Sequence, residues 1–191
     1  IAWSGPLSIL VSKYSASASE IFAGALKSYR RALIVGDTHT HGKGTVQVLS
    51  EITRPLLFSN LLSRNTTKMG STKLTIQKWY LPDGSSTQLK GVAADIVIPS
   101  LNEYLPIAES DLPNAMPWDS IKTMPWTYEE LSDYTDIVYP EDIQSLKNQS
   151  ALRQSSLEEF TFLKQKIDHF KLKQEQKEFS LNLDERRKER L

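Results

Sequence analysis

Residues 7–26 read Leu-Ser-Ile-Leu-Val-Ser-Lys-Tyr-Ser-Ala-Ser-Ala-Ser-Glu-Ile-Phe-Ala-Gly-Ala-Leu. The run from Leu7 to Val11 is apolar and has the length of a buried strand. From Ser17 to Arg30 the apolar side chains recur at helical spacing, and those that share one face are Ile21, Phe22, Ala25 and Leu26. The stretch therefore predicts a buried strand that joins a helix through small residues, the first step of an α/β fold.

Further segments with strand character follow this unit. They are residues 32–35, 45–49, 73–81 and 95–98. The first is closed by Gly36, and the third ends in a Pro-Asp-Gly turn at residues 82–84. The order of strand, helix and strand predicts an α/β core.

The composition of the chain changes after this core. Residues 1–126 carry 12 basic and 9 acidic side chains, whereas residues 127–191 carry 11 and 14. All eight glycines lie at or before Gly91, and all nine prolines at or before Pro140. We therefore divide the chain into a core at 1–99, a Pro-rich connector at 100–126, expected to be extended and irregular, and a helical C-terminal domain at 127–191.

The C-terminal part is expected to consist mainly of helices. One apolar helix face is formed by Leu157, Phe160, Leu163, Ile167 and Phe170. Apolar residues then alternate from Phe179 to Leu183, which predicts a short strand over residues 180–183. The charged segment at 184–191 is expected to be frayed.

The overall composition excludes several classes of protein. The chain of 191 residues has 23 basic and 23 acidic side chains, which argues against a general nucleic-acid binder. It has no cysteine, which excludes disulfides, thiolate catalysis and Cys-ligated metals. No apolar run approaches the roughly 20 residues of a membrane span. Because the chain starts with Ile1 rather than Met, we expect it to be a piece of a longer protein.

Ser17 is the most informative candidate for chemistry. Ser17 and Glu20 fit the capping box S-x-x-E, which is the structural interpretation of this motif. The functional interpretation is a nucleophile, because the N–H groups and the positive dipole end of a helix N-terminus favour a developing oxyanion. Ala16 and Ala18 leave room for a substrate backbone.

A serine nucleophile needs a base, and the sequence offers two kinds. Lys43 lies between two glycines in Gly-Lys-Gly-Thr-Val-Gln (42–47), and these glycines let the backbone pass close to other groups. Gln47 could orient the amine of Lys43. A plain turn or a phosphate loop is the alternative, but Gly44 stands where a Walker A motif needs Ser or Thr. The histidines are His39 and His41, expected to be solvated but also possible metal ligands or bases, and His169, expected at the surface.

Together these motifs resemble the C-terminal processing peptidases, specifically their tail-specific protease branch. The resemblance is carried by Ser-Ala-Ser-Ala-Ser-Glu-Ile-Phe-Ala-Gly-Ala-Leu (15–26), Arg-Ala-Leu-Ile-Val-Gly (31–36) and Gly-Lys-Gly-Thr-Val-Gln (42–47). It continues through Leu-Thr-Ile-Gln-Lys-Trp-Tyr (74–80), Ser-Thr-Gln-Leu-Lys-Gly-Val (86–92), Ala-Asp-Ile-Val-Ile-Pro (94–99), Pro-Trp-Asp-Ser-Ile (117–121) and the tail with Phe-Ser-Leu-Asn (179–182). It covers most of the chain.

The resemblance implies a Ser–Lys peptidase with part of a crotonase-like α/β core, followed by a helical region. It implies Ser17 as nucleophile, Lys43 as general base, Gln47 as its partner and the Ala18 N–H as an oxyanion donor, with no cofactor or metal. Implied substrates are proteins with unstructured, apolar C-termini in the bacterial periplasm or envelope, with an envelope adaptor protein as a possible partner. The family's PDZ domain and upstream oxyanion loop are not in these residues, so we expect the isolated chain to have little activity.

Two positions depart from the family pattern. The loop at 36–42 is one residue longer than usual, and Ser28 stands where tail-specific proteases often carry Asp. One alternative hypothesis is an inactive structural fragment whose helical tail binds a partner. Another is a crotonase-like acyl-CoA enzyme, which would need no lysine base.

Overall fold

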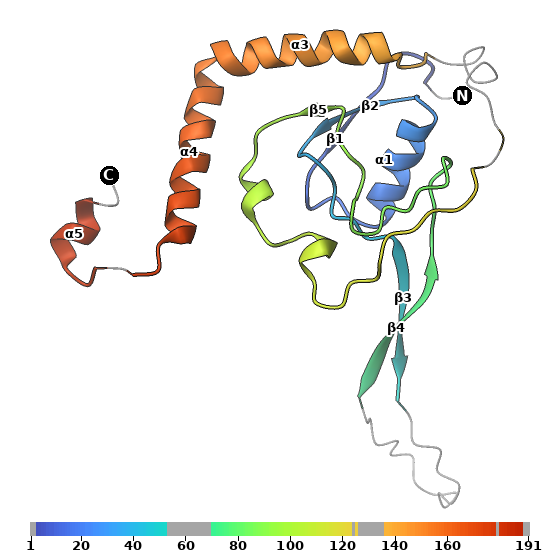
Figure 1. Ribbon diagram of the computed structural model, residues 1–191, viewed down its shortest axis with the longest axis horizontal. Coiled ribbons are helices and arrows are strands. Elements are labelled where there is room, and N and C mark those ends of the chain that lie inside the picture. Colours follow the sequence, from blue (N-terminus) through green and yellow to red (C-terminus); the bar gives the residue numbers. More distant parts are fainter. Residues whose placement is uncertain (1–2, 53–69, 124, 126–135, 179, 189–191) are drawn as a thin grey trace, which may run out of the picture.

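The computed structural model describes residues 3–52, 70–123, 125, 136–178 and 180–188. Its first elements are β1 (Ser8–Val11), α1 (Ala18–Ser28), β2 (Leu33–Gly36), β3 (Thr45–Glu51), β4 (Ser71–Lys78) and β5 (Ile96–Val97). They are followed by the 3-10 helices η1 (Leu101–Tyr104) and η2 (Glu109–Asp111) and the α-helices α3 (Pro140–Ser156), α4 (Glu158–Glu175) and α5 (Leu183–Lys188). This arrangement, drawn in Figure 1, confirms the expected α/β class.

A small parallel sheet carries the turn that leads to Ser17. Its strand order is β1-β2-β5, so that β2 lies in the centre. Parallel neighbours need a crossover, and α1 supplies it between β1 and β2 (Figure 1). The buried core cluster consists of Val11, Ala23, Ile34 and Val92. It therefore fixes the end of β1, and with it the start of the turn to Ser17, against α1.

A second, antiparallel sheet consists of β3 and β4 alone and projects from the core as a ribbon (Figure 1). β3 begins at Thr45, so the ribbon starts directly after Lys43 and Gly44. The register of the two strands shifts between Val46 and Gln47. The strand predicted over residues 73–81 ends at Lys78. The residues after it enter a turn in which the Leu81 N–H donates to the Ser85 carbonyl and the Leu81 carbonyl accepts the Gly84 N–H.

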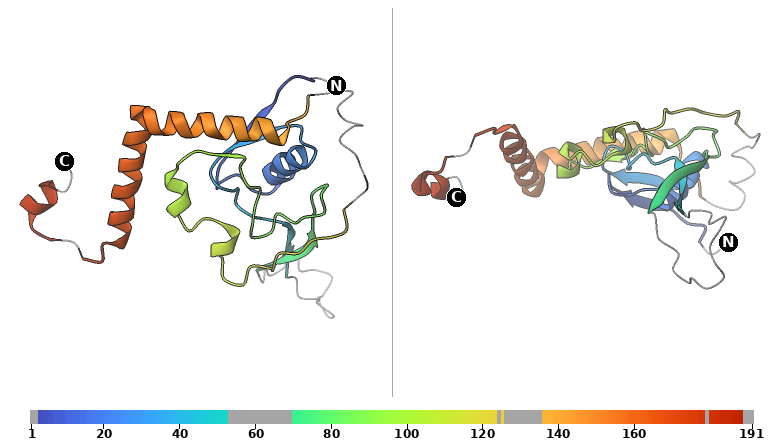
Figure 2. Two further views of the ribbon diagram at one scale, coloured as in Figure 1. Left: turned by 45° about the horizontal axis from the view of Figure 1, so that its top comes forward. Right: turned by 90° about the horizontal axis from the view of Figure 1, so that it is seen from below.

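The helices of the C-terminal part follow from the pattern seen in the sequence. α3 contacts β5 and α4, and α4 contacts η1. Of the residues expected on one apolar helix face, Ile167 on α4 is buried, whereas Leu157 lies between α3 and α4 and is 43% exposed. Figure 2 shows α4 and α5 extending away from the α/β core. No helix in the described ranges is long and apolar enough to cross a membrane.

Three expectations about irregular segments are wrong. The connector contains η1 and η2, so it is not irregular throughout. Residues 180–182 form no strand, and Phe179, where the predicted alternation starts, lies outside the described residues. The segment 184–191, expected to be frayed, contains most of α5. The helix has a local cause: the Asn182 side chain accepts the N–H of Asp184 at 2.9 Å, as an N-cap does, and Asp184 pairs with Arg187 one turn on.

Candidate active site

The backbone of Ser17 is held in a strained conformation between β1 and α1. Its φ and ψ angles are 59° and −114°, a combination that costs a residue other than glycine about 1–3 kcal/mol. The helix begins at the next residue, and within the described chain the N–H of Ala18 has no protein acceptor. A serine in this position can attack a carbonyl group, and the available N–H can stabilise the oxyanion that results.

Glu20 is fully buried and binds both sides of the site. Its Oε2 accepts the backbone N–H of Ser17 at 2.8 Å and that of Lys43 at 2.9 Å. Its Oε1 accepts the Thr40 hydroxyl and the Gly42 N–H, both at 2.6 Å. The bond to Ser17 is the one that the capping box predicts. The other three join the turn at Ser17 to residues 40–43, and sequence reasoning missed them.

The glycines around Lys43 allow a close approach of backbones, as the sequence indicated. Gly42 has a φ of +95°, and a Cβ on Gly44 would lie 2.6 Å from the backbone nitrogen of Gln88. The Gly44 N–H is bound by the buried Gln88 side chain at 2.8 Å, and the Lys43 carbonyl accepts the Thr87 hydroxyl at 3.0 Å. Thr87 and Gln88 lie in the 86–92 motif, and the sequence does not show that they bind the residues around Lys43.

The structure brings Ser17 and Lys43 together through their backbones. Both lie in the described ranges, and there no hydrogen bond joins Ser17 Oγ to Lys43 Nζ. Gln47 lies on β3, where its Nε2 donates to Thr75 Oγ1 at 3.3 Å rather than to Lys43. The roles of Ser17, Lys43, Gln47 and Ala18 therefore stay predictions.

The histidines near the site are less exposed than expected. His39 is half-buried, and its Nδ1 lies 2.7 Å from the carbonyl oxygen of Thr40. His41 is also half-buried. Its backbone N–H donates to the Ser15 carbonyl at 2.9 Å, and its ring Nδ1 lies 3.8 Å from Glu109 Oε2. His169 is exposed, as predicted. The described residues contain no group of three or more side chains that could hold a metal ion.

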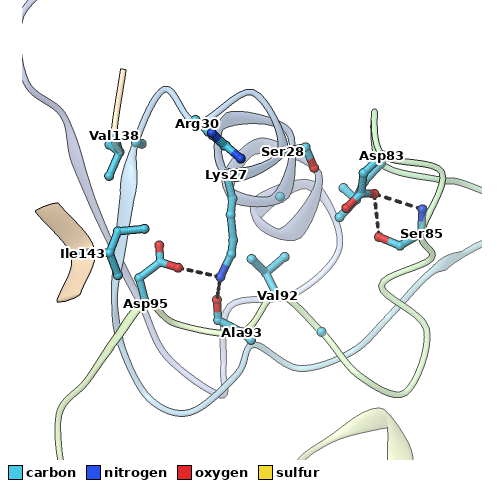
Figure 3. Close-up of a pocket in the computed structure, with 14 residues that line it drawn as sticks. Lys27, Ser28, Arg30, Asp83, Ser85, Val92, Ala93, Asp95, Val138 and Ile143 are labelled. Carbon is cyan, nitrogen blue, oxygen red and sulfur yellow. Dashed lines mark hydrogen bonds and ion pairs between the residues drawn. The ribbon is translucent and has the colours of Figure 1, made fainter. Parts of the chain in front are cut away.

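Ser28 lines a separate cavity of about 380 Å³ at the C-terminal end of α1 (Figure 3). In this cavity Lys27 forms an ion pair with Asp95 at 2.9 Å and donates to the Ala93 carbonyl. None of the predicted catalytic side chains lines it. The position that departs from the family pattern thus lies outside the predicted site.

Comparison with protein families identifies two consecutive segments. The model described as "Peptidase family S41" matches residues 1–98. This chain belongs to peptidase family S41. The model described as "C-terminal domain of tail specific protease" matches residues 102–191, which confirms the resemblance to the tail-specific branch. The finer division of the chain at residues 99 and 126 stays a prediction.

Curated relatives of this S41 chain carry protease names. It is 36% identical over 188 residues to "Tail-specific protease" of Haemophilus influenzae. The matched segment covers 98% of this chain but only 25% of that protein. It is 41% identical over 93 residues to "Carboxy-terminal-processing protease" of Bartonella bacilliformis, covering 49% of this chain and 18% of that protein. It is 42% identical over 92 residues to "Probable CtpA-like serine protease" of Staphylococcus aureus, covering 48% and 16%. The chain thus spans a quarter or less of the length of these relatives.

Proposed function

We propose that this S41 chain carries the nucleophile and base of a serine endopeptidase of the Ser–Lys type. The observation that carries the proposal is the strained turn of Ser17, which shares the buried Glu20 carboxylate with the backbone of Lys43. Two loops that are distant in sequence are thereby fixed side by side, which is what a nucleophile and its base require. The proposed substrates are proteins recognised by unstructured, apolar C-termini. The names of the relatives suggest an action at the C-terminal tail, and the family resemblance implies that this tail is unstructured and apolar.

In the proposed reaction, Ser17 Oγ attacks the carbonyl carbon of the scissile peptide bond. The neutral amine of Lys43 takes the hydroxyl proton as the new C–O bond forms and later gives it to the leaving amine. The Ala18 N–H donates to the oxyanion, and Gln47 orients the amine of Lys43. Water then hydrolyses the acyl-enzyme by the same proton transfers.

A fluorophosphonate probe tests this proposal in the natural full-length protein. Peptide mass spectrometry is expected to find the adduct on Ser17, and Ser17→Ala should abolish both labelling and proteolysis. Ser19→Ala is the matched control, since Ser19 is an exposed serine in the same turn and its removal should leave the adduct on Ser17. An adduct on another serine, or full proteolysis by Ser17→Ala, would refute the assignment.

The proposed tail specificity needs a test of its own. Two substrates that differ only in their last residues, one apolar and one acidic, should be cleaved at different rates, with the apolar tail preferred. Equal values of kcat/KM would contradict tail recognition. The bacterial envelope as location and an adaptor protein as partner are further parts of the proposal, which the resemblance suggests; fractionation of cells and co-purification test them.

The second candidate function is a non-catalytic piece that binds a partner through its helices. Apolar side chains exposed on α3 and α4 favour it, since Leu152, Phe162 and Leu172 are 69%, 57% and 67% exposed. The fluorophosphonate experiment separates the two candidates, because a non-catalytic piece would form no adduct on Ser17.

A further inference from the structure

A strap formed by residues 101–111, from η1 to η2, contacts the loop that carries Lys43. We name residues 37–44 the lysine loop. The Glu103 carboxylate accepts both the N–H and the hydroxyl of Thr38, at 2.7 and 2.6 Å. The Glu109 N–H donates to the His41 carbonyl at 2.8 Å. The strap thus binds the lysine loop near its start and again two residues before Lys43.

The strap also supplies the hydrogen-bond acceptors of Lys13, a buried cation just before the turn to Ser17. Lys13, which is only 7% exposed, donates from Nζ to the carbonyl groups of Glu103 and Leu105 at 3.3 and 3.0 Å. Its backbone N–H donates to Asp37 at 2.7 Å, and the same carboxylate oxygen accepts the Asn102 side chain at 3.0 Å. The segment just before Ser17, the lysine loop and the strap therefore form one connected polar network.

A third connection reaches the far end of the lysine loop. Glu109 Oε1 accepts the amide of Gln88 at 3.1 Å, and the other end of that amide accepts the Gly44 N–H at 2.8 Å. Gln88 is fully buried, so few alternative partners compete for it. With Glu20 binding the middle of the loop, the backbone on both sides of Lys43 is fixed by carboxylates, directly or through Gln88.

We propose that Glu103 and Glu109 are positioning residues for Lys43, an inference that rests on the proposed function. They do not contact the reacting groups; they fix the backbone from which the base extends. A misplacement of a catalytic group by about 1 Å can cost about 100-fold in rate, so a loop fixed at both ends matters for catalysis. Because the strap lies in the segment matched by the tail-specific C-terminal domain, this role makes that domain part of the active-site support.

The strap is itself attached to the helices of that domain. The Lys171 ammonium on α4 lies 4.3 Å from the centroid of the Tyr104 ring on η1. Hydrogen bonding with the Tyr104 side chain is the main cause that raises the pKa of Lys171 above its usual value. This contact joins α4 to the residue directly after Glu103.

The test compares Glu103→Ala, Glu103→Gln and the exposed control Glu158→Ala in the natural full-length protein. Glu103→Ala removes both bonds to Thr38 and should lower kcat and the rate of fluorophosphonate labelling at Ser17 by about 10- to 100-fold, with KM unchanged. Glu103→Gln should recover most of the rate, because its amide oxygen can accept the N–H and its amino group can donate to the hydroxyl. The control should keep the wild-type rate.

The outcomes distinguish this inference from the proposed function. If the wild-type protein is labelled at Ser17 and Glu103→Ala is labelled equally fast, the positioning role is overturned and the proposed function stands. A lower melting temperature with an unchanged rate would overturn it in the same way. If Glu103→Ala does not fold, Thr38→Val removes one of the two bonds and should lower kcat by about 2- to 10-fold; an unchanged kcat overturns the inference. A wild-type protein without label at Ser17 overturns both proposals.

Discussion

The Glu20 carboxylate accepts the backbone N–H of Lys43 at 2.9 Å, although the two residues are 23 positions apart in the sequence. The same oxygen accepts the N–H of Ser17 at 2.8 Å. One buried side chain therefore sets the relative position of the two backbones from which the predicted nucleophile and base extend. This arrangement explains why a residue that would ordinarily cap a helix is fully buried here.

Glu20→Gln should impair both activity and stability. The amide replaces one acceptor oxygen with a donor, so that at least one backbone N–H of the loop or the turn loses its partner inside the protein. We expect a loss of about 1–3 kcal/mol in the free energy of unfolding, and a large fall in kcat. Urea unfolding and peptide hydrolysis measure the two effects. Glu159→Gln, an exposed change of the same type on α4, is the control, and equal behaviour of both variants would contradict the role of Glu20.

Lys43→Arg should be inactive in the natural full-length protein, because a guanidinium stays protonated and cannot accept the serine proton. Lys43→Ala should be equally inactive while it folds normally. His39→Ala and His41→Ala should keep most of the wild-type activity, because neither histidine is the proposed base. Values of kcat/KM for the four variants check these expectations. An active Lys43→Arg enzyme, or a loss of activity in a folded histidine variant as complete as that of Lys43→Ala, would identify a histidine as the base instead.

Ser28→Ala should change the rate of peptide hydrolysis less than about 3-fold, since Ser28 lies at the end of α1 on the wall of a separate cavity. Ser17→Ala, directly before the same helix, should remove activity entirely. Initial rates measured with one peptide substrate compare the two variants directly. If Ser28→Ala were as damaging as Ser17→Ala, Ser28 would have to act at the site despite its position.

Tyr80 provides a prediction about pH at the base of the ribbon. Partial burial, and then its hydrogen bond to Asp119 at 3.1 Å, raise the pKa of Tyr80 above its usual value of 10.0. Because the folded state favours the neutral phenol, this contribution to stability is complete below about pH 10 and is lost as the pH rises through the higher pKa. NMR titration of the tyrosine ring carbons should show that Asp119→Asn lowers the pKa of Tyr80 only in part, since burial is the larger cause. An unchanged pKa would show that Asp119 has no influence on it.

The sequence by itself determined the local elements of this protein. The apolar run before Ser17 and the helical spacing after it predicted β1 and α1, and the glycines beside Lys43 predicted a close approach of backbones. These predictions succeed because strand and helix periodicity, and the freedom of glycine, depend on residues close in the chain. Where a local signal was overlooked, as in the Asn182 cap of α5, the prediction failed.

Only the tertiary structure decided which polar groups meet. The capping box showed one partner of Glu20, whereas its partners at residues 40, 42 and 43 come from a loop that the fold brings to it. Nothing in the sequence of the Pro-rich connector singles out Glu103 and Glu109, and His39 and His41 were expected to be solvated; the contacts of these residues depend on how the strap and the lysine loop lie together. The physical reason is that a buried polar group must find a partner, but the sequence does not record which distant segment supplies it.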